Sequence, residues 1–245
     1  MFTILSGSGA PEWRRRHRRR CSGRMLDVDD DEVAAAYDAR AAEYIALIGS
    51  LDQMERADVA RIGEWRDETP GALLDAGCGP GLWTAFLADP GQDAATAPDH
   101  HRAPGREVVG VDVSGAFLAA ARARHPALRF ESASMRELPF PDGSFGGVLA
   151  WYSLIHVPPA ELPEVFAELA RVLVVGGRIL IGFFHGEPRE RFAHAVAPAY
   201  YWSTETLTPL LEDAGLRVIG SERREREPGA AGSVRPHGAL VAERR

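Results

Sequence analysis

The sequence contains no lysine, so all 28 of its basic residues are arginine. Arginine occurs throughout the chain, including predicted helices where an exposed lysine would serve equally well. We therefore attribute the bias to the codon composition of a GC-rich bacterial genome. Selection for phosphate binding is not needed to explain it.

Cysteine and long apolar runs are scarce as well. The two cysteines, Cys21 and Cys78, cannot form a disulfide framework, which predicts a reducing compartment and a cytoplasmic protein. No apolar run reaches the roughly 18 residues that a membrane helix needs, so we expect no transmembrane segment.

What the sequence does contain is typical of a folded α/β protein. The chain has 245 residues, of which 45% are hydrophobic and 26% charged. This length predicts a single main domain, and the apolar fraction excludes wholesale disorder. A chain of this size buries roughly 70% of its unfolded surface, so its core needs no disulfide or structural metal.

Charge is distributed unevenly along the chain. The formal net charge is −7, which argues against a general nucleic-acid binder, yet the first 24 residues hold seven arginines and one acid. We predict that residues 1–28 form a disordered tail outside a single domain of residues 29–245. An export signal is disfavoured because the acidic run Asp27–Glu32 follows where an apolar stretch would be required. A nucleic-acid-binding arm remains an alternative.

Hydrophobic periodicity predicts alternating helices and strands. Such alternation implies right-handed crossovers, a largely parallel sheet, and ligand binding at the carboxyl ends of its strands. The predicted helices cover residues 29–66, 82–88, 116–124, 160–174 and 204–214, and the predicted strands cover residues 72–75, 108–112, 128–130, 147–151, 178–184, 216–220 and 239–242.

One stretch breaks this alternation. Residues 89–106 contain three prolines and two glycines and show no periodicity. Loops of this length are uncommon inside compact domains, so we predict a flexible surface insertion. Its His100-His101 pair lacks chelating geometry, and we expect no metal site.

The glycine-rich turn after the first predicted strand is the most informative segment. In Asp75-Ala76-Gly77-Cys78-Gly79-Pro80-Gly81, alternating glycines permit positive φ and close approach of the backbone to a ligand. A dinucleotide fingerprint would require a third glycine where Leu82 stands. The acid before the turn would also repel a pyrophosphate, whereas it suits a ligand that carries positive charge.

With these segments the chain resembles the class I S-adenosylmethionine-dependent methyltransferases, specifically the small-molecule branch of the UbiE type. The resemblance covers roughly residues 37–216. It implies a doubly wound, Rossmann-like α/β fold with a seven-stranded, mostly parallel sheet and an N-terminal helical lid over residues 29–68. The matching segments are Tyr37-Asp38-x-x-Ala41-x-x-Tyr44, Asp75-x-Gly77-x-Gly79-x-Gly81, Gly110–Ser114, Leu138–Phe145 and Leu173–Gly177, the last of which resembles the turn before the fifth strand.

The resemblance also implies the cofactor, S-adenosyl-L-methionine, and the residues that bind it. The glycines would accommodate its methionine portion, and Asp112 would accept hydrogen bonds from the ribose hydroxyls. The full set of implied cofactor-binding residues is Tyr37, Tyr44, Asp75, Gly77, Gly79, Gly81, Asp112, Val113, Ser134, Met135 and Trp151.

Two departures from the family pattern bear on this set. Asp112 lies 37 residues after Asp75 instead of the usual twenty or so, and removing the predicted insertion restores the spacing. The usual Gly-Asp-Ala appears here as Ala133-Ser134-Met135. The adenine contact usually made by that aspartate would then fall to Ser134 or to the backbone.

Methyl transfer from a sulfonium needs little from the protein beyond alignment and exclusion of water. A general base is required only when the nucleophile begins protonated, and His156, just beyond the fourth strand, is the candidate. Packing within the loop is its alternative role. Trp151 and Tyr152 either flank the sulfonium cation or pack in the core. Around the expected acceptor side we place an aromatic wall formed by Phe183, Phe184, His185, Tyr200, Tyr201 and Trp202, with about half of these residues in the core.

The sequence therefore predicts a cytoplasmic, bacterial, S-adenosylmethionine-dependent methyltransferase that acts on a small molecule. We expect no metal, no membrane and no nucleic-acid partner, and either a monomer or a homodimer. Two alternatives remain: an RNA methyltransferase guided by the basic tail, and a non-catalytic protein that binds the cofactor.

Overall fold

The computed structural model describes residues 29–88, 106–225 and 235–245. The predicted tail of residues 1–28 and nearly all of the predicted insertion of residues 89–106 lie outside these ranges. No helix in the described ranges combines the length and the apolar character that a membrane span requires.

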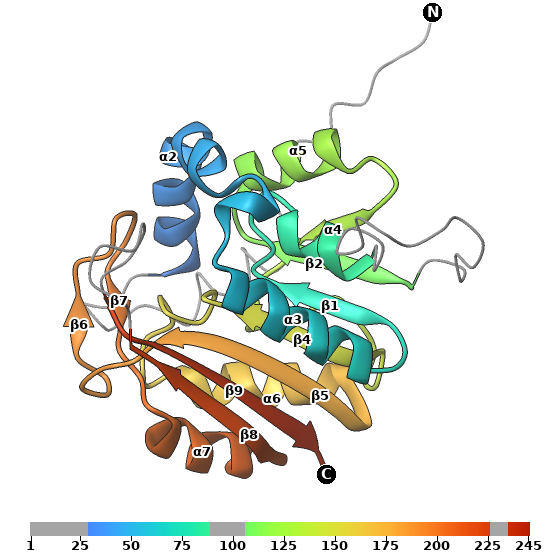
Figure 1. Cartoon of the computed structure of the whole chain (residues 1–245), viewed down its shortest axis with the longest axis vertical. Helices are drawn as coiled ribbons and strands as arrows, with labels where there is room; N and C mark the ends of the chain where they lie inside the picture. Colours follow the sequence, from blue (N-terminus) through green and yellow to red (C-terminus); the bar gives the residue numbers. More distant parts are fainter. Residues whose placement is uncertain (1–28, 89–105, 226–234) are drawn as a thin grey trace, which may run out of the picture.

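A single seven-stranded sheet forms the centre of the molecule (Figure 1). Its first five strands run parallel, and the last two pair antiparallel with their neighbours. In spatial order the strands are β3 (Arg129–Ser132), β2 (Val108–Asp112), β1 (Leu73–Ala76), β4 (Phe145–Trp151), β5 (Leu173–Phe184), β9 (His237–Arg244) and β8 (Leu216–Arg224).

The central strands are buried on both faces, as parallel strands between two helical layers must be. All residues of β1 and β4 are buried, so these strands appear in the sequence as continuous apolar runs. Leu74 and Val148 pack into one hydrophobic cluster, and Leu73 and Leu149 pack into the other. The core therefore has one half on each side of the sheet.

Two layers of helices cover the sheet. The helices are α2 (Asp30–Ile48), α3 (Arg56–Glu68), α4 (Leu82–Ala88), α5 (Gly115–Arg124), α6 (Leu162–Val172) and α7 (Thr204–Asp213), with a short 3-10 helix η1 (Leu51–Gln53). In Figure 1, α3 lies in front of the sheet and α6 behind it. Ile62 and Trp65 of α3 are buried against the sheet, as are Phe166 and Leu169 of α6.

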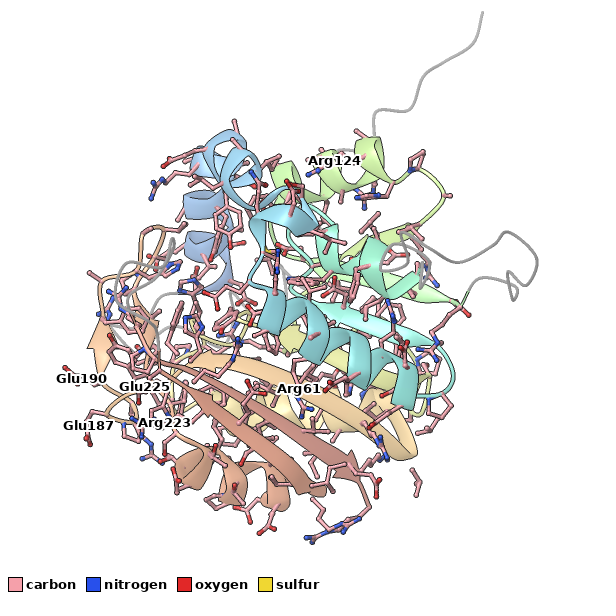
Figure 2. The ribbon with its side chains drawn as sticks, viewed as in Figure 1. Arg61, Arg124, Glu187, Glu190, Arg223 and Glu225 are labelled. Atoms are coloured by element: carbon pink, nitrogen blue, oxygen red, sulfur yellow. The ribbon has the colours of Figure 1, made fainter. Side chains whose placement is uncertain are left out.

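The helical region predicted as a lid divides into two parts. The α3 helix packs on the sheet, whereas α2 lies beyond the ends of the parallel strands and packs against α5 (Figure 1). Asp38 of α2 accepts hydrogen bonds from the Ser114 hydroxyl at 2.5 Å and from the Ala116 amide at 3.0 Å. Arg124, labelled in Figure 2, donates from α5 to the carbonyl of Gly49, which follows α2. These contacts fix α2 beyond the carboxyl ends of the parallel strands, where ligands of such sheets bind.

The segment between α6 and β5 differs from the prediction. The predicted helix 160–174 ends at Val172, and Leu173 already pairs with Phe145 of β4. The expected turn over 173–177 is a bulge inside β5, because the next pair joins Gly147 to Arg178. Leu173 is buried and completes the sheet, while Val175 is 76% exposed on the bulge.

The sequence also gave no indication of a small hairpin, β6 (Arg191–Phe192) and β7 (Ala199–Tyr200). It lies near α2 at the same end of the molecule (Figure 1). Two-residue strands are too short to show alternation, so periodicity cannot reveal them.

Candidate active site

A cavity of about 290 Å³ opens at the carboxyl ends of the parallel strands. Its position agrees with the rule that ligands of open α/β sheets bind beyond these strand ends. Ten of the twelve residues predicted for the site line this cavity: Tyr37, Tyr44, Gly77, Gly79, Asp112, Val113, Ser134, Met135, Trp151 and His156.

The glycine turn after β1 shapes one end of the cavity. Gly77 and Gly79 both have positive φ, 81° and 53° respectively. A Cβ at Gly77 would lie 2.2 Å from Cβ of Ser153, so only glycine allows this turn to approach the loop after β4. A Cβ at Gly79 would meet only Phe117, at 3.9 Å. The turn therefore leaves room for a ligand to lie against its backbone.

Asp112, at the end of β2, is held by two backbone amides. Gly79 donates to its Oδ2 and Ser114 to its Oδ1, both at 2.8 Å. Burial raises the pKa of the Asp112 carboxyl despite these hydrogen bonds. The Val113 amide also stabilises the charged carboxylate, and the acceptor positions that these three amides leave open can receive a hydroxyl donor. This arrangement fits the ribose of S-adenosylmethionine, and the open turn beside it fits the rest of the cofactor.

Two predicted residues, Asp75 and Gly81, do not line the cavity. Asp75 is buried, and its Oδ2 accepts a hydrogen bond from the Thr84 hydroxyl at 2.6 Å. Burial raises the pKa of Asp75 to about 7. A Cβ at Gly81 would lie 3.0 Å from both the Ala121 Cβ and the Phe130 ring. These residues tie the turn to α4, α5 and β3, and do not face the ligand.

The loop after β3 contacts the first turn of α2. The Ser134 hydroxyl donates to Oδ2 of Asp30, and the Arg136 amide donates to the Ser134 hydroxyl at 3.1 Å. The Arg136 guanidinium pairs with Asp30 on one side and with Glu161 at 2.8 Å on the other. Asp30 and Arg136 both line the cavity, and the sequence analysis identified neither of them.

His156 lines the cavity beside Tyr37 and is hydrogen-bonded through both ring nitrogens. Its Nδ1 lies 2.8 Å from the carbonyl of Pro198, and its Nε2 lies 2.9 Å from the Tyr37 hydroxyl. Because a carbonyl can only accept, the proton belongs on Nδ1, and the Tyr37 hydroxyl then donates to Nε2. Burial lowers the pKa of His156 and raises the pKa of Tyr37, so both side chains are neutral near pH 7.

Two further histidines, His194 and His237, also line the cavity, and the sequence analysis missed both. The ring centroid of His194 is 5.3 Å from that of His156, and burial together with His156 lowers the pKa of His194 to about 4. Nδ1 of His237 is hydrogen-bonded to the Tyr152 hydroxyl. They lie 38 and 81 residues from His156 along the chain, so no local spacing could have revealed them.

The predicted aromatic wall is only partly present. Phe184 lines the cavity, as do Tyr152 and Trp151. Phe183, Tyr200 and Trp202 belong to the hydrophobic core, and Tyr201 stacks on Phe192 with centroids 4.2 Å apart. Trp151 is 8% exposed and packs in a core cluster while also lining the cavity, so its core-packing role is present and its contact with the sulfonium stays a prediction.

Neither thiol nor metal chemistry is indicated in the described part of the chain. Cys78 lines the cavity, but burial raises the pKa of its thiol, which makes it a poor nucleophile. No cluster of three or more histidine, cysteine, aspartate or glutamate residues suited to a metal ion occurs within the described ranges.

Comparison with known proteins identifies the family. The family model described as a methyltransferase domain matches residues 73–177. A demethylmenaquinone methyltransferase from Beutenbergia cavernae is 31% identical over 191 residues, which cover 76% of this chain and 70% of that protein.

Solved structures show the same fold. The 1,6-didemethyltoxoflavin-N1-methyltransferase of Burkholderia thailandensis, solved with S-adenosylhomocysteine, superposes with a TM-score of 0.64 at 22% identity, over 90% of this chain and 92% of that one. The [4+2]-cyclase SpnF superposes with a TM-score of 0.68 at 19% identity, over 91% and 98%.

These findings confirm the predicted fold, the cofactor and the enzyme class. The chain belongs to the class I S-adenosylmethionine-dependent methyltransferases of the small-molecule branch.

Proposed function

We propose that this methyltransferase methylates a protonated nucleophile, such as a hydroxyl group, on a small and largely apolar aromatic molecule. The observation that supports the proposal is the chemical difference between two groups of residues that line the cavity, which we call its two ends. Glycine backbone and Asp112 form one end; aromatic rings and neutral histidines form the other. A volume of about 290 Å³ is close to the lower limit of roughly 300 Å³ for small-molecule sites.

In this proposal the glycine end holds the cofactor. Asp112 accepts hydrogen bonds from the ribose hydroxyls, and the backbone of Gly77 and Gly79 lies against the methionine portion. When bound, S-adenosylmethionine supplies a methyl group that its sulfonium charge has already activated. Trp151 and Tyr152, whose ring centroids are 5.3 Å apart, present aromatic surface between the two ends of the cavity. Aromatic faces attract a cation, and these rings also exclude water.

The aromatic end receives the acceptor and its proton. Nε2 of His156 carries a lone pair and accepts a hydrogen bond from Tyr37. When the acceptor hydroxyl loses its proton to Oη of Tyr37, Tyr37 passes its own proton to Nε2 of His156. Tyr37 ends neutral and His156 ends positively charged. The pKa of His156, lowered by burial, keeps it unprotonated and able to act near neutral pH.

Two experiments test the proposal. Isothermal titration with S-adenosylhomocysteine should show binding that Asp112→Ala weakens by about 100-fold, because hydrogen bonds to a charged group each contribute about 1.5–3 kcal/mol. If Asp112→Ala binds as tightly as wild type, the cofactor assignment is wrong. An extract-wide assay with labelled methyl groups should then identify the acceptor, and a labelled polypeptide or RNA in place of a small molecule would contradict the acceptor assignment.

A further inference from the structure

The order of the strands fixes where the third part of the cofactor must lie. The glycine turn follows β1, and Asp112, the proposed ribose ligand, ends β2, which is the neighbour of β1 in the sheet. A ligand that extends further in the same direction reaches the loop after β3. That loop contributes Ser134, Met135 and Arg136 to the cavity, and the first turn of α2 contributes Asp30 beside them.

The lining at this place suits a planar heterocycle with an amino group at its edge. Val113 and Met135 offer apolar surface for the faces of a ring. Asp30 is the acidic side chain there, and its exposed fraction is only 17%. A carboxylate accepts hydrogen bonds but cannot donate them when ionised, so it favours an N–H donor over a carbonyl oxygen.

We propose that Asp30, on the lid helix, is the residue that recognises the exocyclic amine of the cofactor's adenine. The inference rests on the proposed placement of the cofactor. It differs from the expectation that Ser134 or the backbone makes this contact. The Ser134 oxygen already accepts from the Arg136 amide and is uncharged, whereas the Asp30 carboxylate offers charged acceptor positions.

The surrounding hydrogen bonds fix the position of the Asp30 carboxylate and leave acceptor positions open. Ser134 and Arg136 each occupy one acceptor position of the carboxylate, which leaves about two positions open. Arg136 is itself fixed by Glu161 through two hydrogen bonds, at 2.8 and 3.0 Å. A carboxylate held from two sides loses little conformational freedom when it accepts a further hydrogen bond.

The same helix reaches the proposed base. Tyr37 follows Asp30 by seven residues, which is two helical turns, so both side chains lie on one face of α2. Recognition of adenine by Asp30 therefore favours the position of α2 in which Tyr37 contacts His156. Through this helix the cofactor stabilises the part of the cavity that receives the acceptor.

Titration calorimetry with two ligands tests the inference without any turnover. The ligands are S-adenosylhomocysteine and its 6-deamino analogue, in which hydrogen replaces the exocyclic amine. Wild type should bind the amine-bearing ligand about tenfold to 100-fold more tightly, the range expected for one hydrogen bond to a charged group. In Asp30→Ala this preference should fall to less than about threefold. Asp30→Asn keeps an acceptor oxygen but loses the charge, so its preference should lie between those of wild type and Asp30→Ala.

Glu32→Ala is the matched control. Glu32 lies in the same turn of α2 and carries the same charge, but it is exposed and does not line the cavity. It should retain the wild-type preference. An equal loss of affinity for both ligands in Asp30→Ala and Asp30→Asn would overturn the inference, because Asp30 would then only support the lid. Failure of wild type to bind S-adenosylhomocysteine at all would instead overturn the placement of the cofactor.

Discussion

The two ends of the cavity are assembled in different ways. Gly77 and Gly79 lie in the loop that directly follows β1, and Asp112 is the last residue of β2, the neighbouring strand of the sheet. The other end combines Tyr37 from α2, His156 from the loop after β4, His194 from the hairpin region and His237 from the start of β9. The residues of the first group each carry a signal in the neighbouring sequence, whereas those of the second group come from distant segments, and His194 and His237 carry no such signal.

This difference separates what a methyltransferase shares with its relatives from what distinguishes it. The backbone of the glycine turn and the carboxylate of Asp112 serve a cofactor that is common to the family, and short segments at the ends of two adjacent strands suffice for that part of the site. Side chains from distant segments determine which acceptor fits, so each of those segments can change without disturbing the cofactor end. Variants should therefore affect one end and leave the other intact.

The largest separation is expected for His156→Gln. Loss of a general base slows the chemical step by about 10²–10⁴-fold, while the affinity for S-adenosylhomocysteine should not change. Tyr37→Phe should also slow the chemical step, because the acceptor proton reaches His156 through Oη of Tyr37. Rates are measured with the acceptor identified by methyl labelling, and affinity by titration calorimetry.

The pH profile distinguishes this role from packing. A base must be unprotonated, so the wild-type rate should rise with pH through a pKa below 6.5, the lowered pKa of His156, and then level off. His156→Gln should lose that rise. An unchanged profile, or a matching loss of cofactor affinity, would show that His156 supports the cavity structurally.

The sequence was sufficient for the glycine turn and for most of the sheet because both leave local signals. Continuous apolar runs such as Leu73-Leu74 predict buried strands, and alternating glycines after an acid predict the turn. Asp30 carried no such signal, since its partners Ser134 and Arg136 lie more than 100 residues away. The bulge after Leu173 was missed because it follows α6 without an intervening loop.

The close approach of the glycine turn to the loop after β4 can be tested by substitution of Gly77. A Cβ there would collide with Ser153 and also require a left-handed conformation, so Gly77→Ala should destabilise the protein by about 3 kcal/mol. Gly176→Ala is the control, because its φ of 78° is similar but its Cβ would meet nothing within 4 Å. Strain alone predicts about 1 kcal/mol for it. Equal urea midpoints for the two variants would show that the Gly77–Ser153 approach does not matter.

A smaller effect, on the pH dependence of stability, is expected from Asp75, the aspartate that precedes the glycine turn. Asp75 faces Thr84 instead of the cavity, and its folded-state pKa of about 7 lies above the unfolded value near 3.9. The folded state then binds the proton more tightly, so the free energy of unfolding should fall from about pH 4 to pH 7, by at most about 1.4 kcal/mol per pH unit. Asp75→Asn should flatten this dependence in urea unfolding, whereas Asp52→Asn, at an exposed position, should not. Parallel pH slopes for wild type and Asp75→Asn would contradict the assignment.

The smallest effect is expected from the arginine-rich segment. Within the described ranges the cavity lining begins at Asp30, so deletion of residues 1–24 should leave both cofactor affinity and turnover of a small acceptor unchanged. Seven arginines could still neutralise phosphates, and such binding weakens steeply with salt. Filter binding with RNA at 50 and 200 mM salt measures this. If RNA binding and RNA methylation both disappear with the segment, the acceptor end serves a nucleotide instead of a free small molecule. If neither changes, the absence of lysine and the abundance of arginine reflect codon composition alone.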